Sequence, residues 1–327
     1  PEGKVLYSYR PPNGLKIQNK TVPFGKILII YEARPDVTIE AAAIAFKAGN
    51  RVFLKGGREA RKTNLLLVKL WQEALAANKL ERSFITYLDF SREKTQNLIK
   101  NNSQDIDLII PRGGEGLINF VKQNTSIPVI TSGRGNNFLY VDQKSDFDMA
   151  IKIIINGKQR VSVCNALDKV LLHQNLPKVK KKIATLVSNL KTNQIEILGD
   201  KKICKFNNQI QAVQDAAIWS EEFLSKKILL GLVKNTDGAI KMINQYSGRH
   251  SASIITKNKK TAEKFQNQVD CAAVYHNAGT RFTDGGQFGL GAEMAISTQK
   301  LHWRGPLGVN QLVTNKWFIN GTGQTRE

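Results

Sequence analysis

From Val22 onward, short apolar runs alternate with amphipathic stretches, an order typical of a parallel sheet wrapped by helices. In residues 23–145 we expect strands at 26–33, 51–55, 83–89, 106–110 and 127–131 and helices at 37–49, 63–79, 92–100 and 115–124. In residues 146–300 we expect strands at 168–173, 195–198, 227–234, 252–256 and 272–276 and helices at 147–157, 177–191, 236–246 and 261–268. The chain has 327 residues, more than the roughly 250–300 at which one core stops growing. The sequence therefore predicts an α/β fold with two doubly wound lobes.

Both ends of the chain read differently from the lobes. In residues 5–22, two polar and apolar alternations flank the turn formers Pro11 to Gly14, which predicts a protruding β-hairpin arm. The tail at 311–320 predicts another outlying strand. We therefore assign residues 1–22 to an arm and 301–327 to a C-terminal return and strand, and we expect both to serve contacts in a homo-oligomer. The sequence begins at Pro1 rather than at a methionine and reads as the continuation of a longer chain, so we expect a leading segment to be missing.

The composition indicates a cytoplasmic chain with reduced thiols. No stretch of 18 or more apolar residues occurs, and no charged and apolar leader precedes a cleavage site. The three cysteines, Cys164, Cys204 and Cys271, are odd in number and lack C-x-x-C spacing, which argues against a disulfide framework and a zinc site. No two of the four histidines have the spacing of metal ligands. We therefore expect no membrane contact and no metal.

The formal net charge of +21 invites a nucleic-acid interpretation, because a basic domain attracts phosphate backbones. The lysines, however, fall in scattered clusters on expected helix edges and turns, such as Lys178 with Lys180 to Lys182. Aromatic residues do not interleave with them as a stacking platform requires. We interpret these lysines as solvated surface whose field favours an anionic substrate and cofactor.

Cys164 lies among small residues, Ser162 to Ala166, just after an expected apolar helix. A nearby cation, Arg160, and helix-terminus amides would lower the pKa of its thiol and favour the thiolate, the reactive form. The alternative is a small buried hydrophobe, which the other two cysteines fit better. A second run, residues 277–293, is too rich in glycine and polar residues for a core element. Together the two runs predict an enzyme.

Three loops that follow expected strands, at 34–36, 55–57 and 111–114, should share one rim, because ligands of such sheets lie at the carboxyl ends of strands. Backbone amides of the glycines in the last loop can approach a phosphate. A lysine and an arginine at 55 and 58 can bind the 2′-phosphate of an adenosine. Ordinary turn chemistry is the alternative for both loops.

Several runs of this chain carry a resemblance to a known family: Thr21 to Gly25, Tyr31 to Thr38, Ile110 to Gly114, Ser162 to Ala166, Thr280 to Glu293, Ser297 to His302 and Arg304 to Pro306. On these motifs the chain resembles the gamma-glutamyl phosphate reductases, or glutamate-5-semialdehyde dehydrogenases, of the aldehyde dehydrogenase superfamily. The likeness extends from about Gly3 to the end. The family carries an additional leading helical segment, which agrees with the expected truncation.

The resemblance implies an aldehyde dehydrogenase-like fold with an NADP-binding Rossmann-like lobe at 23–145, a catalytic lobe at 146–300 and a hairpin arm for oligomerisation. It implies reduction of L-glutamate 5-phosphate by NADPH to L-glutamate 5-semialdehyde in proline synthesis, with glutamate 5-kinase as a partner. Under this hypothesis the Cys164 thiolate attacks the acyl phosphate, phosphate leaves, hydride adds to the thioester and the thiohemiacetal collapses to aldehyde. Asn165 or a backbone amide near Cys164 is the expected donor to the oxyanion.

The resemblance also implies the binding residues. Those for the cofactor are Lys55, Gly57, Arg112, Gly113, Gly114 and Glu222. Those for the substrate are Arg34, Asp36, Asn277, Thr280, Arg281 and Arg304. An arginine fork suits a carboxylate or phosphate, whereas an aspartate suits an amino group. Structural salt bridges are the alternative for the arginines, and a helix-surface charge is the alternative for Glu222.

The chain departs from the family pattern at Thr131-Ser132, Asn137-Phe138, Val161, Ala252 and Gly279, which affects the fine positioning of substrate. The family pair at 131 usually begins with glutamate, but an acyl-phosphate reductase needs no water activation in its forward direction. Two other functions stay open. One is a related enzyme of the superfamily that oxidises a different semialdehyde, and the other is an inactive basic binding protein on this fold.

Overall fold

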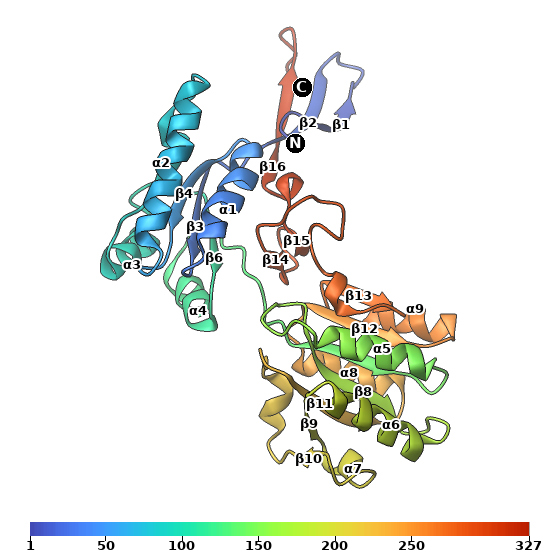
Figure 1. Ribbon diagram of the computed structural model, residues 1–327. Coiled ribbons are helices and arrows are strands. Elements are labelled where there is room, and N and C mark those ends of the chain that lie inside the picture. Colours follow the sequence, from blue (N-terminus) through green and yellow to red (C-terminus); the bar gives the residue numbers. More distant parts are fainter. Residues whose placement is uncertain (327) are drawn as a thin grey trace. The chain divides into compact units, whose positions relative to one another are not determined.

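The structure of the chain is a computed structural model that describes residues 1–326. It divides into two compact units. Unit 1 comprises residues 1–131, 289–295 and 301–326, and unit 2 comprises residues 132–288 and 296–300. Each unit contains a parallel sheet with helices on both faces, so the prediction of two doubly wound α/β lobes is confirmed (Figure 1).

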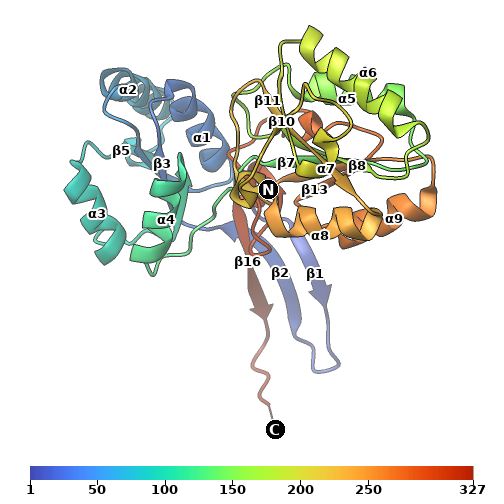
Figure 2. The same cartoon turned by 90° about the horizontal axis from the view of Figure 1, so that it is seen from below.

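Unit 1 is built on a four-stranded sheet in the order β5-β4-β3-β6. Its strands are β3 (Lys26–Tyr31), β4 (Arg51–Lys55), β5 (Ile85–Tyr87) and β6 (Leu108–Arg112). Its helices are α1 (Pro35–Lys47), α2 (Arg61–Ala77), η1 (Arg82–Phe84), α3 (Arg92–Asn101) and α4 (Glu115–Asn124). Ile27 and Ile29 of β3 pack with α1 and α2, whereas Leu28 and Ile30 pack with α3 and α4. Figure 2 shows these two pairs of helices on opposite faces of the sheet. A central strand covered on both faces explains the continuous apolar run that predicted it.

Unit 2 is built on a seven-stranded sheet in the order β10-β9-β11-β8-β7-β12-β13. Its strands are β7 (Asn137–Val141), β8 (Leu167–His173), β9 (Glu196–Gly199), β10 (Gln211–Ala212), β11 (Lys227–Val233), β12 (Ser251–Ile255) and β13 (Ala273–His276). Its helices are α5 (Phe147–Gly157), α6 (Val179–Thr192), α7 (Lys201–Cys204), η2 (Ala216–Ser220), α8 (Thr236–Tyr246), α9 (Lys259–Gln268) and η3 (Thr280–Phe282). Helices α5 and α6 cover one face and α8 and α9 the other (Figure 2).

A separate antiparallel sheet in unit 1 joins the two ends of the chain. It consists of β1 (Val5–Tyr9), β2 (Lys16–Pro23) and β16 (Val313–Asn320) in the order β1-β2-β16. The hairpin and the tail strand therefore lie where the sequence predicted strands. Shorter elements are β14 (Ile296–Ser297), β15 (Gly305–Pro306) and η4 (Val309–Gln311). The role of this sheet in oligomerisation stays a prediction.

Two expectations differ from the structure. Residues 127–131 make only a single bridge, between Ile109 and Val129, because Pro128 offers no amide to a ladder. Conversely, β7 was not expected, although it lies between β8 and β12 in the middle of the larger sheet. The division between the units therefore falls after Thr131 rather than after Ser145, and residues 289–295 return to unit 1.

Candidate active site

The loop that carries Cys164 connects α5 to β8 in unit 2, and Cys164 is exposed. Asn137 holds this loop from the start of β7. Its Nδ2 donates to the carbonyl oxygens of Cys164 and Ala166, at 2.7 Å each, and its Oδ1 accepts a 3.0 Å hydrogen bond from the amide of Ser251. One fully buried amide group thus ties the cysteine loop to β7 and β12.

Asn165 fastens the same loop to the glycine-rich run. Its Nδ2 donates to the carbonyl oxygens of Arg281 (3.2 Å) and Thr283 (3.0 Å). The hydroxyl of Thr280 donates to the Asn165 carbonyl oxygen at 2.8 Å, and the Arg281 guanidinium donates to Asn165 Oδ1. The structure therefore brings Thr280 and Arg281 into contact with the residue that follows Cys164, and their substrate roles stay predictions. The side-chain amide of Asn165 and the hydroxyl of Thr280 are used within the protein, which weakens the case for Asn165 as the oxyanion donor.

A pocket of about 450 Å³ adjoins the cysteine loop. It is lined by Asn156, Gln159, Arg160, Val163, Asn165, Arg281, Phe282, Asp284 and Gln287. Two guanidinium groups and one carboxylate line the same hollow, a charge pattern that complements an amino acid bearing extra negative charge. Of these charged residues only Arg281 was predicted to bind substrate. Asp284 and Gln287 stand in the run 277–293, whose composition was the available signal.

The helix before Cys164 does not supply the amides that were expected to favour its thiolate. Helix α5 ends at Gly157, so it presents its C-terminus, where the unbonded backbone groups are carbonyl oxygens and the dipole is negative. The expectation of helix-terminus amides from α5 is therefore wrong. Arg160 and Arg281 line the pocket that adjoins the cysteine loop, so their positive charges can favour a thiolate there.

Glu222 also lies beside Cys164. A Cβ placed on Gly135 would be 2.5 Å from Glu222 Oε1 and 2.7 Å from Cys164 Cα. Both residues therefore pack against the same glycine, where no side chain fits. The predicted cofactor carboxylate thus belongs to unit 2 and adjoins the predicted nucleophile.

The other predicted cofactor residues lie together in unit 1. In the register of the sheet, Lys55 of β4 pairs with Ile30, and Arg112 of β6 pairs with the next residue, Tyr31. The loops after these strands therefore share one rim, as expected. Lys55 is half-buried, and burial lowers the pKa of its ammonium, which donates to the Gly56 carbonyl oxygen at 3.0 Å. A Cβ on Gly57 would lie 3.1 Å from the backbone nitrogen of Ala33.

The Glu32 carboxylate already accepts a hydrogen bond from one glycine amide of this rim. The amide of Gly114, at the start of α4, donates to Glu32 Oε1 at 2.8 Å, and a Cβ on Gly113 would lie 3.0 Å from the same oxygen. Glu32 was not singled out from the sequence. The chemistry of Lys55 fits an adenosine phosphate, whereas the amide of Gly114 would first have to release Glu32.

The remaining predicted substrate residues are engaged elsewhere. Arg34 pairs with Asp36 at 2.8 Å on the exposed start of α1. Burial tends to raise the pKa of Asp36, but the hydrogen bond and charge of Arg34 outweigh it and hold the pKa below its usual range. Asn277 exchanges two 3.0 Å hydrogen bonds with the backbone of Thr256, so it closes the ends of β12 and β13. Arg304 lies in unit 1, and its substrate role stays a prediction.

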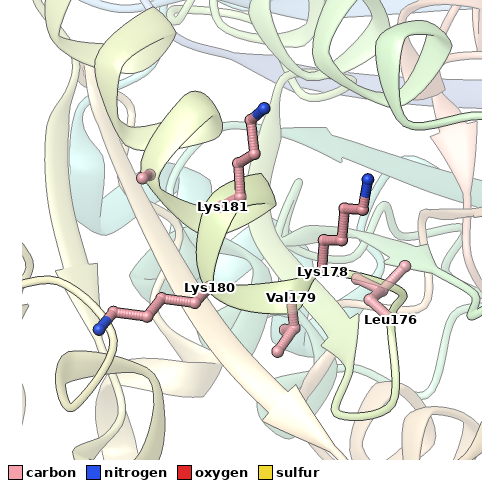
Figure 3. Close-up of a pocket in the computed structure, with 6 residues that line it drawn as sticks. Leu176, Lys178, Val179, Lys180 and Lys181 are labelled. Carbon is pink, nitrogen blue, oxygen red and sulfur yellow. The ribbon is translucent and has the colours of Figure 1, made fainter.

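The lysines around the pocket at the start of α6 do not all converge on one point (Figure 3). A second pocket, at the start of α6, is lined by Leu176, Lys178, Val179, Lys180, Lys181 and Ala184. The ammonium of Lys180 points away from those of Lys178 and Lys181 (Figure 3). This arrangement supports the interpretation of these lysines as solvated surface.

Other features that bear on function can be stated for residues 1–326. Within this range no helix has both the length and the apolar character needed to cross a membrane. In the same range no group of three or more His, Cys, Asp and Glu side chains is placed to hold a metal ion. His250 is fully buried, its Nδ1 lies 2.8 Å from Ser251 Oγ, and burial lowers its pKa to about 4.

The class of protein is defined by two α/β units, each built on a parallel sheet, and by an exposed cysteine on a loop that hydrogen bonds hold in place. The profile of the aldehyde dehydrogenase family matches residues 9–201 and 210–293, and the chain belongs to this family. It is therefore an oxidoreductase.

Comparison with individual proteins gives the branch of the family. The chain is 46% identical over 334 residues to the gamma-glutamyl phosphate reductase of Caldicellulosiruptor bescii, covering 100% of this chain and 78% of that protein. The crystal structure of gamma-glutamyl phosphate reductase from Thermotoga maritima aligns with a TM-score of 0.95 at 40% identity, covering 100% of this chain and 78% of that one. The chain thus belongs with the gamma-glutamyl phosphate reductases. An acetylating aldehyde dehydrogenase from Geobacillus thermoglucosidasius shares the fold at 18% identity, with a TM-score of 0.73 and coverage of 99% and 80%.

Proposed function

We propose that this chain reduces L-glutamate 5-phosphate to L-glutamate 5-semialdehyde with NADPH, as a step of proline synthesis in the cytoplasm. The observation that carries the proposal is the exposed Cys164 on a loop tied down by Asn137 and Asn165, next to a pocket with two arginines and an aspartate. The names of the relatives at 40–46% identity support the substrate.

In the proposed mechanism, the Cys164 thiolate attacks the acyl carbon, a carbon–sulfur bond forms, and the bond to the phosphate oxygen breaks. Bound NADPH supplies the hydride that reduces the resulting thioester. The oxyanion of the thiohemiacetal then re-forms a carbonyl and expels the Cys164 thiolate, which gives the aldehyde. One proton from solvent ends on the released phosphate, so charge and atoms balance.

The proposed binding roles follow from the charges of the residues that line the pocket, of Lys55 in unit 1 and of Glu222 beside Cys164. Arg160 and Arg281 suit the anionic groups of the substrate, and Asp284 suits its ammonium group. Lys55 is the residue of the unit 1 rim whose chemistry fits the cofactor phosphate. Glu222, beside Cys164, suits the ribose hydroxyls next to the nicotinamide.

The test measures NADPH formation from glutamate semialdehyde with and without inorganic phosphate. We expect phosphate-dependent turnover that Cys164→Ser abolishes while NADPH binding is kept. Cys204→Ser, which alters a partly buried thiol bonded to the Gly199 carbonyl oxygen, is the matched control and should keep turnover. Full activity in Cys164→Ser would refute the mechanism. Turnover of free aldehyde with NAD and without phosphate would instead favour another semialdehyde dehydrogenase.

We further propose that the chain forms a homo-oligomer through the sheet β1-β2-β16. Every residue of β1 is exposed. The side chains of Tyr7 and Trp317 are each about half exposed, although their rings pack edge to face with their centroids 5.8 Å apart. Large aromatic side chains exposed together mark interaction surfaces.

A further inference from the structure

Two hydrogen bonds from buried side chains hold the backbone on either side of Glu222. Lys169 Nζ donates to the carbonyl oxygen of Glu221 at 2.7 Å, and Asp168 Oδ2 accepts from the amide of Phe223 at 2.8 Å. The other oxygen of Asp168 pairs with Lys158 Nζ at 2.7 Å. Lys158, Asp168 and Lys169 are at most 2% exposed.

The path of β8 explains how neighbouring residues grip the same segment. Asn137 of β7 pairs with Leu167, but the next residue, Phe138, pairs with Lys169, so Asp168 is an extra residue in the strand. Consecutive side chains of a regular strand point to opposite faces, whereas a bulge re-aims one of them. The ammonium of Lys169 also lies 3.4 Å from the centroid of the Phe223 ring.

Burying the charges of this cluster costs folding free energy, because the charged groups lose their hydration. Apolar side chains of the same volume often give an equally stable core. The charged groups that act on Lys169 are Asp168 of its own strand, Lys158 after α5, and Glu221 and Glu222 of the segment that it holds. The structural result of the cluster is that the backbone is fixed immediately before and after Glu222.

We propose that Asp168 and Lys169, with Lys158 behind them, are positioning residues that set the Glu222 carboxylate beside Cys164 for its contact with the cofactor. The inference rests on the proposed function in one respect, namely that Glu222 contacts NADPH. Lys169 acts through Glu222 and contacts neither the substrate nor the reacting atoms.

A double-mutant cycle tests this relationship. Lys169→Met is introduced into the natural chain and into Glu222→Gln, and the dissociation constant of NADPH is measured by its fluorescence, together with kcat and KM. We expect each single change to weaken NADPH binding about 10-fold, and the double variant to be no weaker than Glu222→Gln alone. Effects that multiply to about 100-fold would overturn the proposal, because they would show that Lys169 acts independently of Glu222.

Lys227→Met is the matched control. Lys227 lies 5.7 Å from the same Phe223 ring, but it is half-exposed and pairs with Glu196, so its removal should leave NADPH binding within twofold in both backgrounds. If Lys169→Met fails to unfold cooperatively in urea, Lys169→Gln, which keeps a donor, replaces it and should show the same non-additivity in a smaller effect. The binding cycle needs no turnover, so failure of the proposed reaction appears separately, as absent semialdehyde oxidation in the natural chain.

Discussion

Asn137 Nδ2 donates a 2.7 Å hydrogen bond to the carbonyl oxygen of Cys164, a residue 27 positions further along the chain. The same amide group bonds the carbonyl oxygens of Gly135 and Ala166 and the amide of Ser251. No part of Asn137 is exposed to solvent. The position of the proposed nucleophile therefore depends on a side chain from a neighbouring strand.

Replacing Asn137 by leucine, which has a similar shape, should leave buried backbone groups without their partners. Each of the four groups that Asn137 bonds costs about 1–3 kcal/mol when unpaired, so we expect a loss of at least about 4 kcal/mol in the free energy of unfolding. Urea unfolding measures this loss, and turnover should fall with it. Asn101→Leu, at an exposed position of α3, is the control and should change stability by about 0.5 kcal/mol or less. Equal effects of the two substitutions would contradict the proposed role of Asn137.

Local patterns predicted the fold well where a strand or helix has an uninterrupted signal. The boundaries of α4, α5 and α8 agree with the expected ranges, because helix periodicity and polar flanks coincide there. Strand β7 was missed because its five residues follow the polar, glycine-rich run 132–136, which obscures where the strand begins. It is a central strand because it pairs with β8 and β12, and this pairing belongs to the tertiary structure and not to the local sequence.

The site was predictable where chemistry is concentrated in one motif. Cys164 and Arg281 stand in unusual runs, and Arg281 donates a hydrogen bond to Asn165, the residue after Cys164. Asn277 was expected to bind substrate, but its amide serves the backbone of Thr256, and sequence cannot tell these uses apart. Lys169 reads as a charged residue in an apolar strand, and its role depends on a register shift that no local pattern shows.

Arg160 is exposed at the mouth of the pocket beside Cys164, so it can be changed without loss of folding. Arg160→Gln removes a charge-assisted contact worth about 1.5–3 kcal/mol, which corresponds to an increase of about 10- to 100-fold in the KM for the phosphorylated substrate. Steady-state kinetics should show the KM for NADPH nearly unchanged. Lys152→Gln, exposed within α5 and outside the pocket, controls for the loss of one positive charge. A matching KM increase in Lys152→Gln would show a general effect of charge.

Lys169 makes stability depend on pH. Burial, only partly offset by Asp168, lowers the pKa of its ammonium to about 7 from 10.5. Between these values the unfolded chain binds more protons than the folded one, so the unfolding free energy of the natural chain rises with pH. Relative to Lys169→Met, this rise should approach about 1.4 kcal/mol per pH unit at most.

Urea unfolding of the natural chain and of Lys169→Met between pH 6 and pH 9 measures this difference. The unfolding free energy of the natural chain minus that of Lys169→Met should be smallest below pH 7 and should increase as the pH rises. The result should persist at high salt, because buried charges are weakly screened. A difference that stays constant across this range would mean that Lys169 has the same pKa in the folded and unfolded chains.

The exposed aromatic pair of the arm should control the oligomeric state. Trp317→Ser removes the ring that Tyr7 contacts and a large apolar area from β16. We expect the mass measured by light scattering to fall toward that of a single chain, with both α/β units still folded. Lys316→Ser, at the neighbouring exposed position, should leave the mass unchanged. A single-chain mass in the unaltered protein would contradict an oligomer-forming arm.

At Gly135, the addition of a single methyl group should lower catalytic activity without unfolding the protein. Gly135→Ala would place a methyl group 2.7 Å from Cys164 Cα and 2.5 Å from Glu222 Oε1, closer than such contacts allow, so the cysteine loop has to move. Because misplacement by about 1 Å can cost about 100-fold in rate, we expect kcat/KM to fall by about that factor while urea unfolding stays cooperative. In the same unit, the Cβ of Gly238→Ala meets its nearest atom at 3.6 Å, so this variant should keep full activity. Normal turnover in Gly135→Ala would show that the reaction tolerates displacement of Cys164 or Glu222, and both assignments would then have to be revised.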